Sequence, residues 1–138
     1  MKAFPLFSLL LMALFTAACG GQNTAPAPEP SETTTVVQTS AVQDLSPEEF
    51  ADRIGAPNTV VLDVRTPGET AGGVIPGAIE LDFRSPDFAA QISQLDKDKT
   101  YLVYCAAGGR SSKACGMMEE AGFREVYNLT GGYRAWKE

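Results

Sequence analysis

The residues best suited to chemistry lie between Cys105 and Ser111, where the sequence reads Cys-Ala-Ala-Gly-Gly-Arg-Ser. An apolar run over 101–104 precedes this segment, and a helix is predicted to begin at Ser111. Alanine and glycine leave the backbone N–H groups unobstructed, so a tight loop of this composition directs its amides inward at an anion. The positive end of the following helix and the Arg110 guanidinium act in the same direction. We therefore expect Cys105 to have a lowered pKa and to act as a nucleophile without a histidine base.

The composition excludes several alternative chemistries. The 138 residues include no histidine, which removes Ser-His-Asp hydrolysis, Cys-His proteolysis and histidine-ligated metals. The cysteines, Cys19, Cys105 and Cys115, are too few for a four-thiolate zinc site or a disulfide-stapled scaffold, so we expect no metal and no cofactor. Seventeen acidic residues against 11 basic ones give a net charge of −6, which argues against a nucleic-acid partner. The length suits one folded domain, which we expect to be a monomer.

The first 18 residues have the features of a signal peptide. Lys2 provides a positive start, and the apolar run over 4–15 is shorter than the about 20 residues that a membrane-spanning helix needs. Small residues then lead into Cys19. This arrangement resembles a bacterial lipoprotein signal, which implies that Cys19 is lipidated and anchors the mature protein to a membrane. The resemblance implies the periplasmic side of the cell envelope, and the outer membrane in a diderm. The alternative is an ordinary cleaved signal with an incidental Cys19.

The segment over 19–43 is predicted to be the lipidated N-terminus followed by a disordered linker. From residue 20 onward it contains three prolines and five threonines, with no aromatic and no basic residue. Such a segment buries too little apolar surface to offset the entropy lost on ordering. We expect it to hold the folded domain away from the membrane.

The remainder of the chain alternates strand-like and helix-like segments. A capping box formed by Ser46 and Glu49 marks the start of the first helix. The predicted helices cover 46–54, 86–95, 111–121 and 131–136. The predicted strands cover 59–64, 78–83, 101–104 and 126–129. This order predicts an α/β domain with a mostly parallel sheet, whose ligands gather at the carboxyl ends of the strands.

Several motifs, in this order, resemble a rhodanese-type domain. They are Asp63-Val64-Arg65-Thr66-Pro67-Gly68-Glu69, Gly73-Val74-Ile75-Pro76-Gly77-Ala78, the Cys105–Ser111 loop, Gly122-Phe123, and the run over 126–132 with Trp136. The resemblance covers the domain predicted at 44–138. It implies a three-layer α/β fold, with a central parallel five-stranded sheet and helices on both faces. It also implies sulfurtransferase activity, in which Cys105 attacks a sulfane-sulfur donor, becomes a persulfide and passes the outer sulfur to cyanide or a thiol.

The same resemblance assigns roles within the loop. The backbone amides that are expected to hold the persulfide charge belong to Ala106, Ala107, Gly108, Gly109, Arg110 and Ser111. The Arg110 side chain is expected to close the loop and to help hold an anionic donor. The six residues from Cys105 to Arg110 suit a sulfur atom, whereas phosphatases of the family have a loop one residue longer.

The sequence departs from the family pattern at two places. Val74 stands where the family commonly has histidine; this position is not the nucleophile, so we expect the chemistry to survive. Ala106 and Ala107 replace positions that often carry arginine or other polar residues. Their small side chains remove positive charge from the pocket mouth, which favours a persulfide or polysulfide donor over thiosulfate.

Other residues are expected to have supporting roles. Arg65 and Glu69 are expected to orient a loop near the pocket, with Arg65 also a candidate for anion binding, while Asp63 is expected to accept backbone amides. Cys115 is interpreted as a core residue, the alternative being a resolving thiol for Cys105. Tyr133 and Trp136 are expected to pack the last helix. The alternatives to an enzyme are a non-catalytic binding module and a redox sensor.

Overall fold

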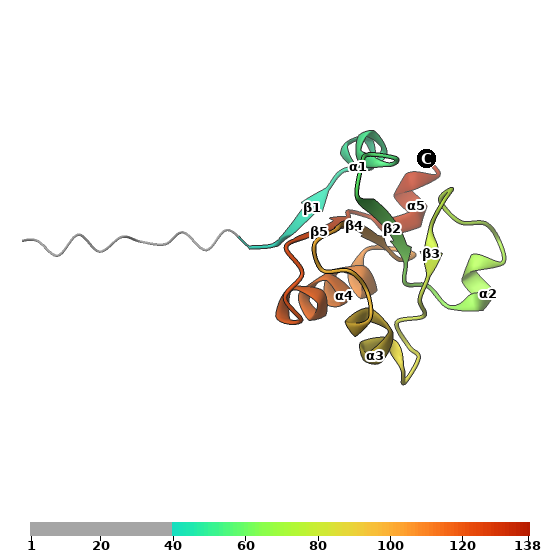
Figure 1. Cartoon of the computed structure of the whole chain (residues 1–138). Helices are drawn as coiled ribbons and strands as arrows, with labels where there is room; N and C mark the ends of the chain where they lie inside the picture. The colour runs from blue at the N-terminus through green and yellow to red at the C-terminus, as the bar shows by residue number, and fades with distance from the viewer. Residues whose placement is uncertain (1–39) are drawn as a thin grey trace, which may run out of the picture. The chain divides into compact units, whose positions relative to one another are not determined.

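The computed structural model describes residues 40–138, which form a five-stranded, all-parallel sheet with helices on both of its faces (Figure 1). The strands are β1 (Val42–Leu45), β2 (Thr59–Asp63), β3 (Ile79–Glu80), β4 (Thr100–Tyr104) and β5 (Glu125–Leu129). Their order across the sheet is β1-β5-β4-β2-β3, so β4 lies at the centre. The helices are α1 (Pro47–Arg53), α2 (Pro67–Thr70), α3 (Phe88–Ser93), α4 (Gly109–Glu120) and α5 (Gly132–Trp136). The predicted fold class is confirmed.

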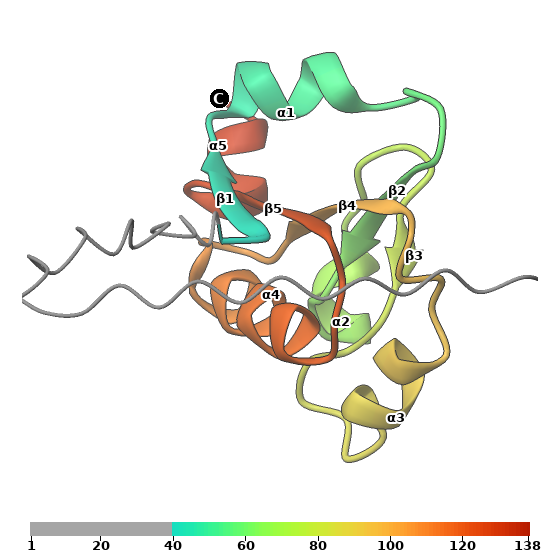
Figure 2. The same ribbon diagram turned by 60° about the vertical axis from the view of Figure 1, so that its left-hand side comes forward.

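Alternation along the central strand builds two cores. Tyr101 and Val103 face α3 and α4, while Leu102 and Tyr104 face α1 and α5, because successive side chains of a strand point to opposite sides. Figure 2 shows the two helical layers on either side of the sheet. Four β4 side chains, at 101–104, are at most 1% exposed, as expected for a strand covered on both faces.

The predicted helix starts and strand positions mostly agree with the structure. The capping box at α1 is present, with the Ser46 amide donating to Glu49 Oε2 at 2.9 Å and the Glu49 amide donating to Ser46 Oγ at 3.3 Å. The segment predicted as a strand at 78–83 contains only the two residues of β3, because Leu81 and Phe83 already leave the ladder and bond back to Asp63 and Val64.

Two elements were not predicted from the pattern. Strand β1 starts at Val42, inside the segment 19–43 that we expected to be a linker, and pairs in parallel with β5 from Val126 to Leu129. Its polar residues give no strand signal of their own, and the pairing with β5 is what orders them. The short helix α2 begins after Thr66, whose amide bonds to the Glu69 carboxylate at 3.0 Å.

The N-terminal predictions lie outside the described residues. These are the signal peptide at 1–18, the lipidated Cys19 and the linker up to residue 39. Within 40–138, no helix has the length and apolar character required to cross a membrane.

Candidate active site

Cys105 follows the last residue of the central strand and is enclosed by the loop that comes after it. Its side chain is only 2% exposed. The Gly108 amide donates to the Cys105 Sγ atom at 3.1 Å, and the Ser111 hydroxyl lies 3.5 Å from the same sulfur. Gly108 has a φ of +94°, a left-handed conformation that glycine adopts without strain. This turn directs the loop amides inward, as the sequence predicts.

The surroundings of the Cys105 sulfur favour the thiolate. Burial on its own raises the pKa of the thiol, because it removes the charged form from water. The Ser111 hydroxyl and the amides of Ser111, Ala107 and Arg110 outweigh that effect, and the pKa of Cys105 lies below its ordinary value. The expectation of a lowered pKa is thus confirmed, and its source is the loop's own hydrogen-bond donors.

The Arg110 side chain forms a two-pronged ion pair with Glu69 on α2. The two terminal nitrogens lie 2.8 Å and 2.6 Å from the two carboxylate oxygens. The hydrogen bonds from Arg110 hold the pKa of Glu69 far below its usual range. The pair ties α2 to the loop across 41 residues of sequence, and it offsets the positive charge expected near Cys105. Binding of an anionic donor by Arg110 remains a prediction. The donor has to compete with the Glu69 carboxylate for the same guanidinium nitrogens.

Arg65 is buried and engaged in holding the neighbouring segment. Its Nε and Nη2 atoms donate to the Asp63 carboxylate, the closest contact being 2.6 Å. Its remaining side-chain hydrogen bonds go to the carbonyl oxygens of Glu69 at 3.3 Å and Gly73 at 2.7 Å, and its guanidinium lies over the Tyr133 ring, 4.0 Å from the centroid. Asp63 also accepts the Arg65 amide at 3.0 Å, so its predicted role as a backbone acceptor is confirmed. These contacts fit a positioning role for Arg65, while anion binding by it stays a prediction.

The start of α5 holds the other side of the loop, a feature that the sequence analysis missed. The Tyr133 amide donates to the Cys105 carbonyl at 2.7 Å, and the Arg134 amide donates to the Ala106 carbonyl at 3.1 Å. Gly132 lies so close that a Cβ atom there would be 2.5 Å from the Cys105 oxygen and 2.6 Å from the Ala107 nitrogen. The only sequence signal was the adjacent pair Gly131 and Gly132.

The side chains of α5 also pack as predicted. The Tyr133 ring stacks on Tyr104 with a centroid distance of 5.9 Å. The Trp136 ring meets Phe50 of α1 edge-on at 6.2 Å. The helix is therefore anchored on the sheet by its aromatic residues while its first turn contacts the loop.

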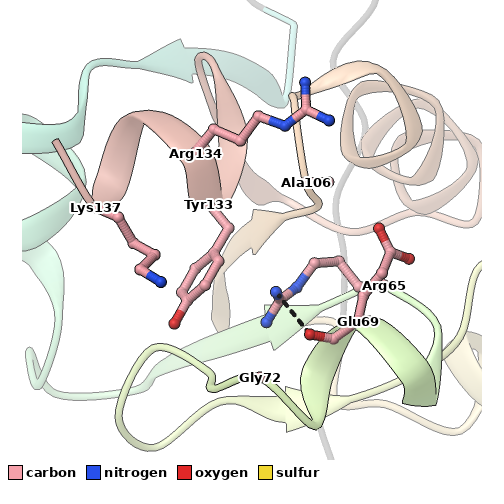
Figure 3. Close-up of a pocket in the computed structure, with 7 residues that line it drawn as sticks. All are labelled: Arg65, Glu69, Gly72, Ala106, Tyr133, Arg134 and Lys137. Atoms are coloured by element: carbon pink, nitrogen blue, oxygen red, sulfur yellow. Dashed lines mark hydrogen bonds between the residues drawn. The ribbon is translucent and has the colours of Figure 1, made fainter.

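A pocket of about 350 Å³ borders the loop at Ala106 (Figure 3). Its lining residues are Arg65, Glu69, Gly72, Ala106, Tyr133, Arg134 and Lys137. The pocket lies at the carboxyl ends of the strands, where the sequence analysis places it. Cys105 is not among its lining residues, since the thiol points toward Gly108 and Ser111.

Cys115 lies in the core on α4 and is fully buried. Both Cys105 and Cys115 are free thiols. Burial is the main cause that raises the pKa of Cys115 to about 12. Because a thiol must ionise before it attacks another sulfur, this residue is poorly suited to resolve an oxidised Cys105. The structure thus favours the core interpretation.

Within residues 40–138, no group of three or more His, Cys, Asp or Glu residues could hold a metal ion.

Fold and loop together define an α/β domain that carries a buried cysteine with a lowered pKa directly after the central strand of a parallel sheet. The chain matches the model of the family described as "Rhodanese-like domain" over residues 46–138, and it belongs to this family. A protein named "Sulfurtransferase" from Allochromatium vinosum is 35% identical over 96 residues, which cover 69% of this chain and 88% of that protein. The family and such relatives support sulfur transfer as the general activity.

Two further comparisons show that the similarity is confined to the rhodanese-like domain. A "tRNA uridine(34) hydroxylase" from Agrobacterium fabrum is 35% identical over 98 residues, but this chain covers only 31% of it. The crystal structure of a rhodanese-like domain protein from Staphylococcus aureus has a TM-score of 0.61 and 28% identity, covering 68% of this chain and 90% of that one. The shared unit is therefore the rhodanese-like domain itself, which other proteins combine with further sequence.

Proposed function

We propose that this protein is a membrane-tethered, single-domain sulfurtransferase that moves sulfane sulfur through a persulfide on Cys105 to a thiol or cyanide acceptor. The observation that carries the proposal is the contact of the Cys105 sulfur with the loop, with the Gly108 amide at 3.1 Å and a lowered thiol pKa. A thiolate formed by backbone donors is available as a nucleophile without a proton-accepting side chain.

The reaction has two steps, both centred on one sulfur atom. In the first, the Cys105 thiolate attacks the terminal sulfur of the donor, and the donor's sulfur–sulfur bond breaks. The leaving group is sulfite when the donor is thiosulfate and a thiolate when the donor is a persulfide. In the second, the acceptor attacks the outer sulfur of the Cys105 persulfide, and the bonding pair returns to Cys105 as thiolate. Loop amides aimed at the sulfur stabilise the negative charge in both steps.

The loop favours a persulfide or polysulfide as the donor. Positions 106 and 107 are alanine and carry no charge, and the Arg110 guanidinium is already paired with Glu69. A small dianion such as thiosulfate therefore finds no unpaired side-chain cation on the loop itself, since Arg134 and Lys137 lie outside it, in the pocket beside Ala106. Because Cys105 is only 2% exposed, any donor has to present a terminal sulfur to the enclosed thiolate, which thiosulfate and a linear polysulfide both do, so the preference rests on charge.

Intact-mass analysis tests the proposal. The protein is incubated with polysulfide and, separately, with thiosulfate, and excess donor is removed before measurement. We expect a gain equal to one sulfur atom, mapped to Cys105, and a greater yield from polysulfide. If neither donor adds sulfur although the thiol reacts with small alkylating agents, the domain is a binding module. A disulfide between Cys105 and Cys115 after oxidation would instead indicate a redox sensor.

Replacing Ser111 by alanine is expected to raise the pKa of Cys105. The Ser111 hydroxyl lies 3.5 Å from the sulfur and is a hydrogen-bond donor to the thiolate, so its loss disfavours the charged form. At a pH below the thiol pKa, alkylation and persulfide formation should therefore slow. The measurement is the rate of iodoacetamide alkylation against pH. The matched control is Ser112→Ala, because Ser112 is exposed on the same helix; an equal shift in both variants contradicts the assignment.

Membrane attachment is the second part of the proposal, and it is supported by the sequence around Cys19. We expect Cys19→Ala to abolish lipid labelling and to move the protein from the membrane fraction of a bacterial host into the soluble fraction. Two or more acyl chains hold a protein stably on a bilayer, so the redistribution should be nearly complete. The test combines labelled palmitate with detergent partitioning, and Cys115→Ala is the control. A wild-type protein that carries no lipid would show that the signal is an ordinary one.

A further inference from the structure

We infer that the pocket beside Ala106 is an acceptor subsite, in which Arg134 and Lys137 bind the anionic group of a small thiol. The inference rests on the proposed sulfur transfer from Cys105. It assigns the pocket to the second step, because it lies beside the nucleophile loop and does not include the buried sulfur.

Two of the four charged residues that line the pocket are already neutralised. Arg65 is paired with Asp63 at 2.6 Å, and both residues are almost completely buried. Glu69 is paired with Arg110, also at 2.6 Å. Neither pair leaves a net charge facing the pocket.

Arg134 and Lys137 are the remaining charged residues of the pocket. Both are exposed, and among residues 40–138 neither has an ion-pair partner within 4.0 Å. The pocket thus carries two uncompensated positive charges, although the chain as a whole has a net charge of −6. Local positive potential in an acidic protein attracts anions to that place.

The two cations are connected directly to the catalytic loop. Arg134 lies on α5 and Lys137 directly follows the helix. The Arg134 amide donates to the Ala106 carbonyl at 3.1 Å, and the Tyr133 amide donates to the Cys105 carbonyl at 2.7 Å. Figure 3 shows Arg134, Tyr133 and Lys137 along one side of the pocket, with Arg65 and Glu69 on the other side. An anionic group held by α5 is therefore placed next to the loop that carries the persulfide.

The dimensions of the pocket suit a small molecule. Its volume of about 350 Å³ lies at the lower end of the range for small-ligand sites. Ala106 and Gly72 leave space, and the Tyr133 ring, with the Lys137 ammonium 5.5 Å and the Arg65 guanidinium 4.0 Å from its centroid, forms part of the wall. We accordingly assign the occupant to small thiols that carry a carboxylate or another anionic group. A folded protein acceptor would contact a wider surface and would depend less on these two residues.

In the assigned step, the anionic group stays bound to Arg134 and Lys137 while the thiolate of the same molecule attacks. A new sulfur–sulfur bond forms between the acceptor and the outer sulfur of the Cys105 persulfide. The bond between the outer sulfur and Cys105 breaks, and its electron pair remains on Cys105 as thiolate. The products are the acceptor persulfide and the regenerated enzyme.

Steady-state kinetics with two matched acceptors tests the subsite. Glutathione carries carboxylates, whereas its diethyl ester has the same thiol without them. For Arg134→Gln/Lys137→Gln, we expect KM for glutathione to rise about tenfold, from the loss of two partly screened charge contacts. The kcat for glutathione and KM for the ester should stay within twofold. The matched control is Lys113→Gln/Arg124→Gln, which removes two exposed charges outside the pocket.

A binding measurement makes the test independent of turnover. S-methylglutathione, which has no free thiol, is titrated into the Cys105→Ser protein with and without the Arg134→Gln/Lys137→Gln changes. We expect the protein that also carries the Arg134→Gln/Lys137→Gln changes to bind S-methylglutathione about tenfold more weakly. In this titration, equal binding by both proteins, or binding by neither, overturns the subsite. In the kinetics, an equal rise of KM for glutathione and for its ester overturns it as well. Failure of Cys105 to form a persulfide would overturn the proposed function instead, and this titration would still decide the subsite.

Discussion

Replacing Cys105 by serine is expected to abolish sulfur transfer while the domain stays folded. The loop donors that favour a thiolate cannot ionise a hydroxyl, whose pKa is several units higher than that of a thiol. Removing a nucleophile typically lowers kcat by on the order of a thousandfold or more. Serine is slightly smaller than cysteine, and the Gly108 amide that contacts Sγ at 3.1 Å still has an acceptor in its hydroxyl oxygen. Turnover with polysulfide and cyanide, together with circular dichroism, measures both expectations.

Cys115→Ala is the matched control for this variant. Cys115 is fully buried on α4 and its thiol stays protonated, so alanine should preserve turnover within a few-fold and lower stability modestly. If Cys105→Ser retains wild-type turnover, or if Cys115→Ala alone removes it, the assignment of the nucleophile is wrong.

The second large effect is expected at Gly132, where alanine should disrupt the loop. Gly132 has a φ of +63°, and its added Cβ would lie 2.5 Å from the Cys105 carbonyl oxygen. The left-handed conformation and the overlap with backbone together cost on the order of 3 kcal/mol. This is a large part of the about 5–15 kcal/mol by which such domains are stable. Activity should fall even where the protein remains folded, since relief of the overlap moves the Cys105 and Ala107 backbone.

Urea unfolding measures the change in the free energy of unfolding of Gly132→Ala, and Gly116→Ala provides the control. Gly116 lies within α4, and a Cβ there would meet nothing within 4 Å. Alanine should therefore stabilise that helix by about 1 kcal/mol, because glycine is a poor helix former. Unchanged stability and activity in Gly132→Ala would show that the close approach of α5 to the loop is not required.

The local sequence pattern was insufficient to predict the first strand, at the N-terminal boundary of the domain. The strands predicted at 59–64 and 101–104 are recognisable because each is a mostly apolar run, rich in β-branched or aromatic residues, as is typical of a strand covered on both faces. The segment Val42–Leu45 has no such run, and for that reason its first two residues, Val42 and Gln43, were placed in the predicted linker although they belong to strand β1. Its order comes from bonds to β5, including the Val126 amide to the Ala41 carbonyl at 2.9 Å.

The sequence by itself determined the parts of this protein that depend on neighbours in the chain. These are the α/β order, the cysteine at the end of a buried strand, and the glycine loop whose amides lower its pKa. Only the tertiary structure decided what surrounds that loop: the pairing of Arg110 with Glu69, the contact of Gly132 with the Cys105 backbone, and the positive pocket on α5. The physical reason is that these groups are separated by 27 residues or more and meet only because the sheet order β1-β5-β4-β2-β3 brings the carboxyl ends of β2, β4 and β5 side by side.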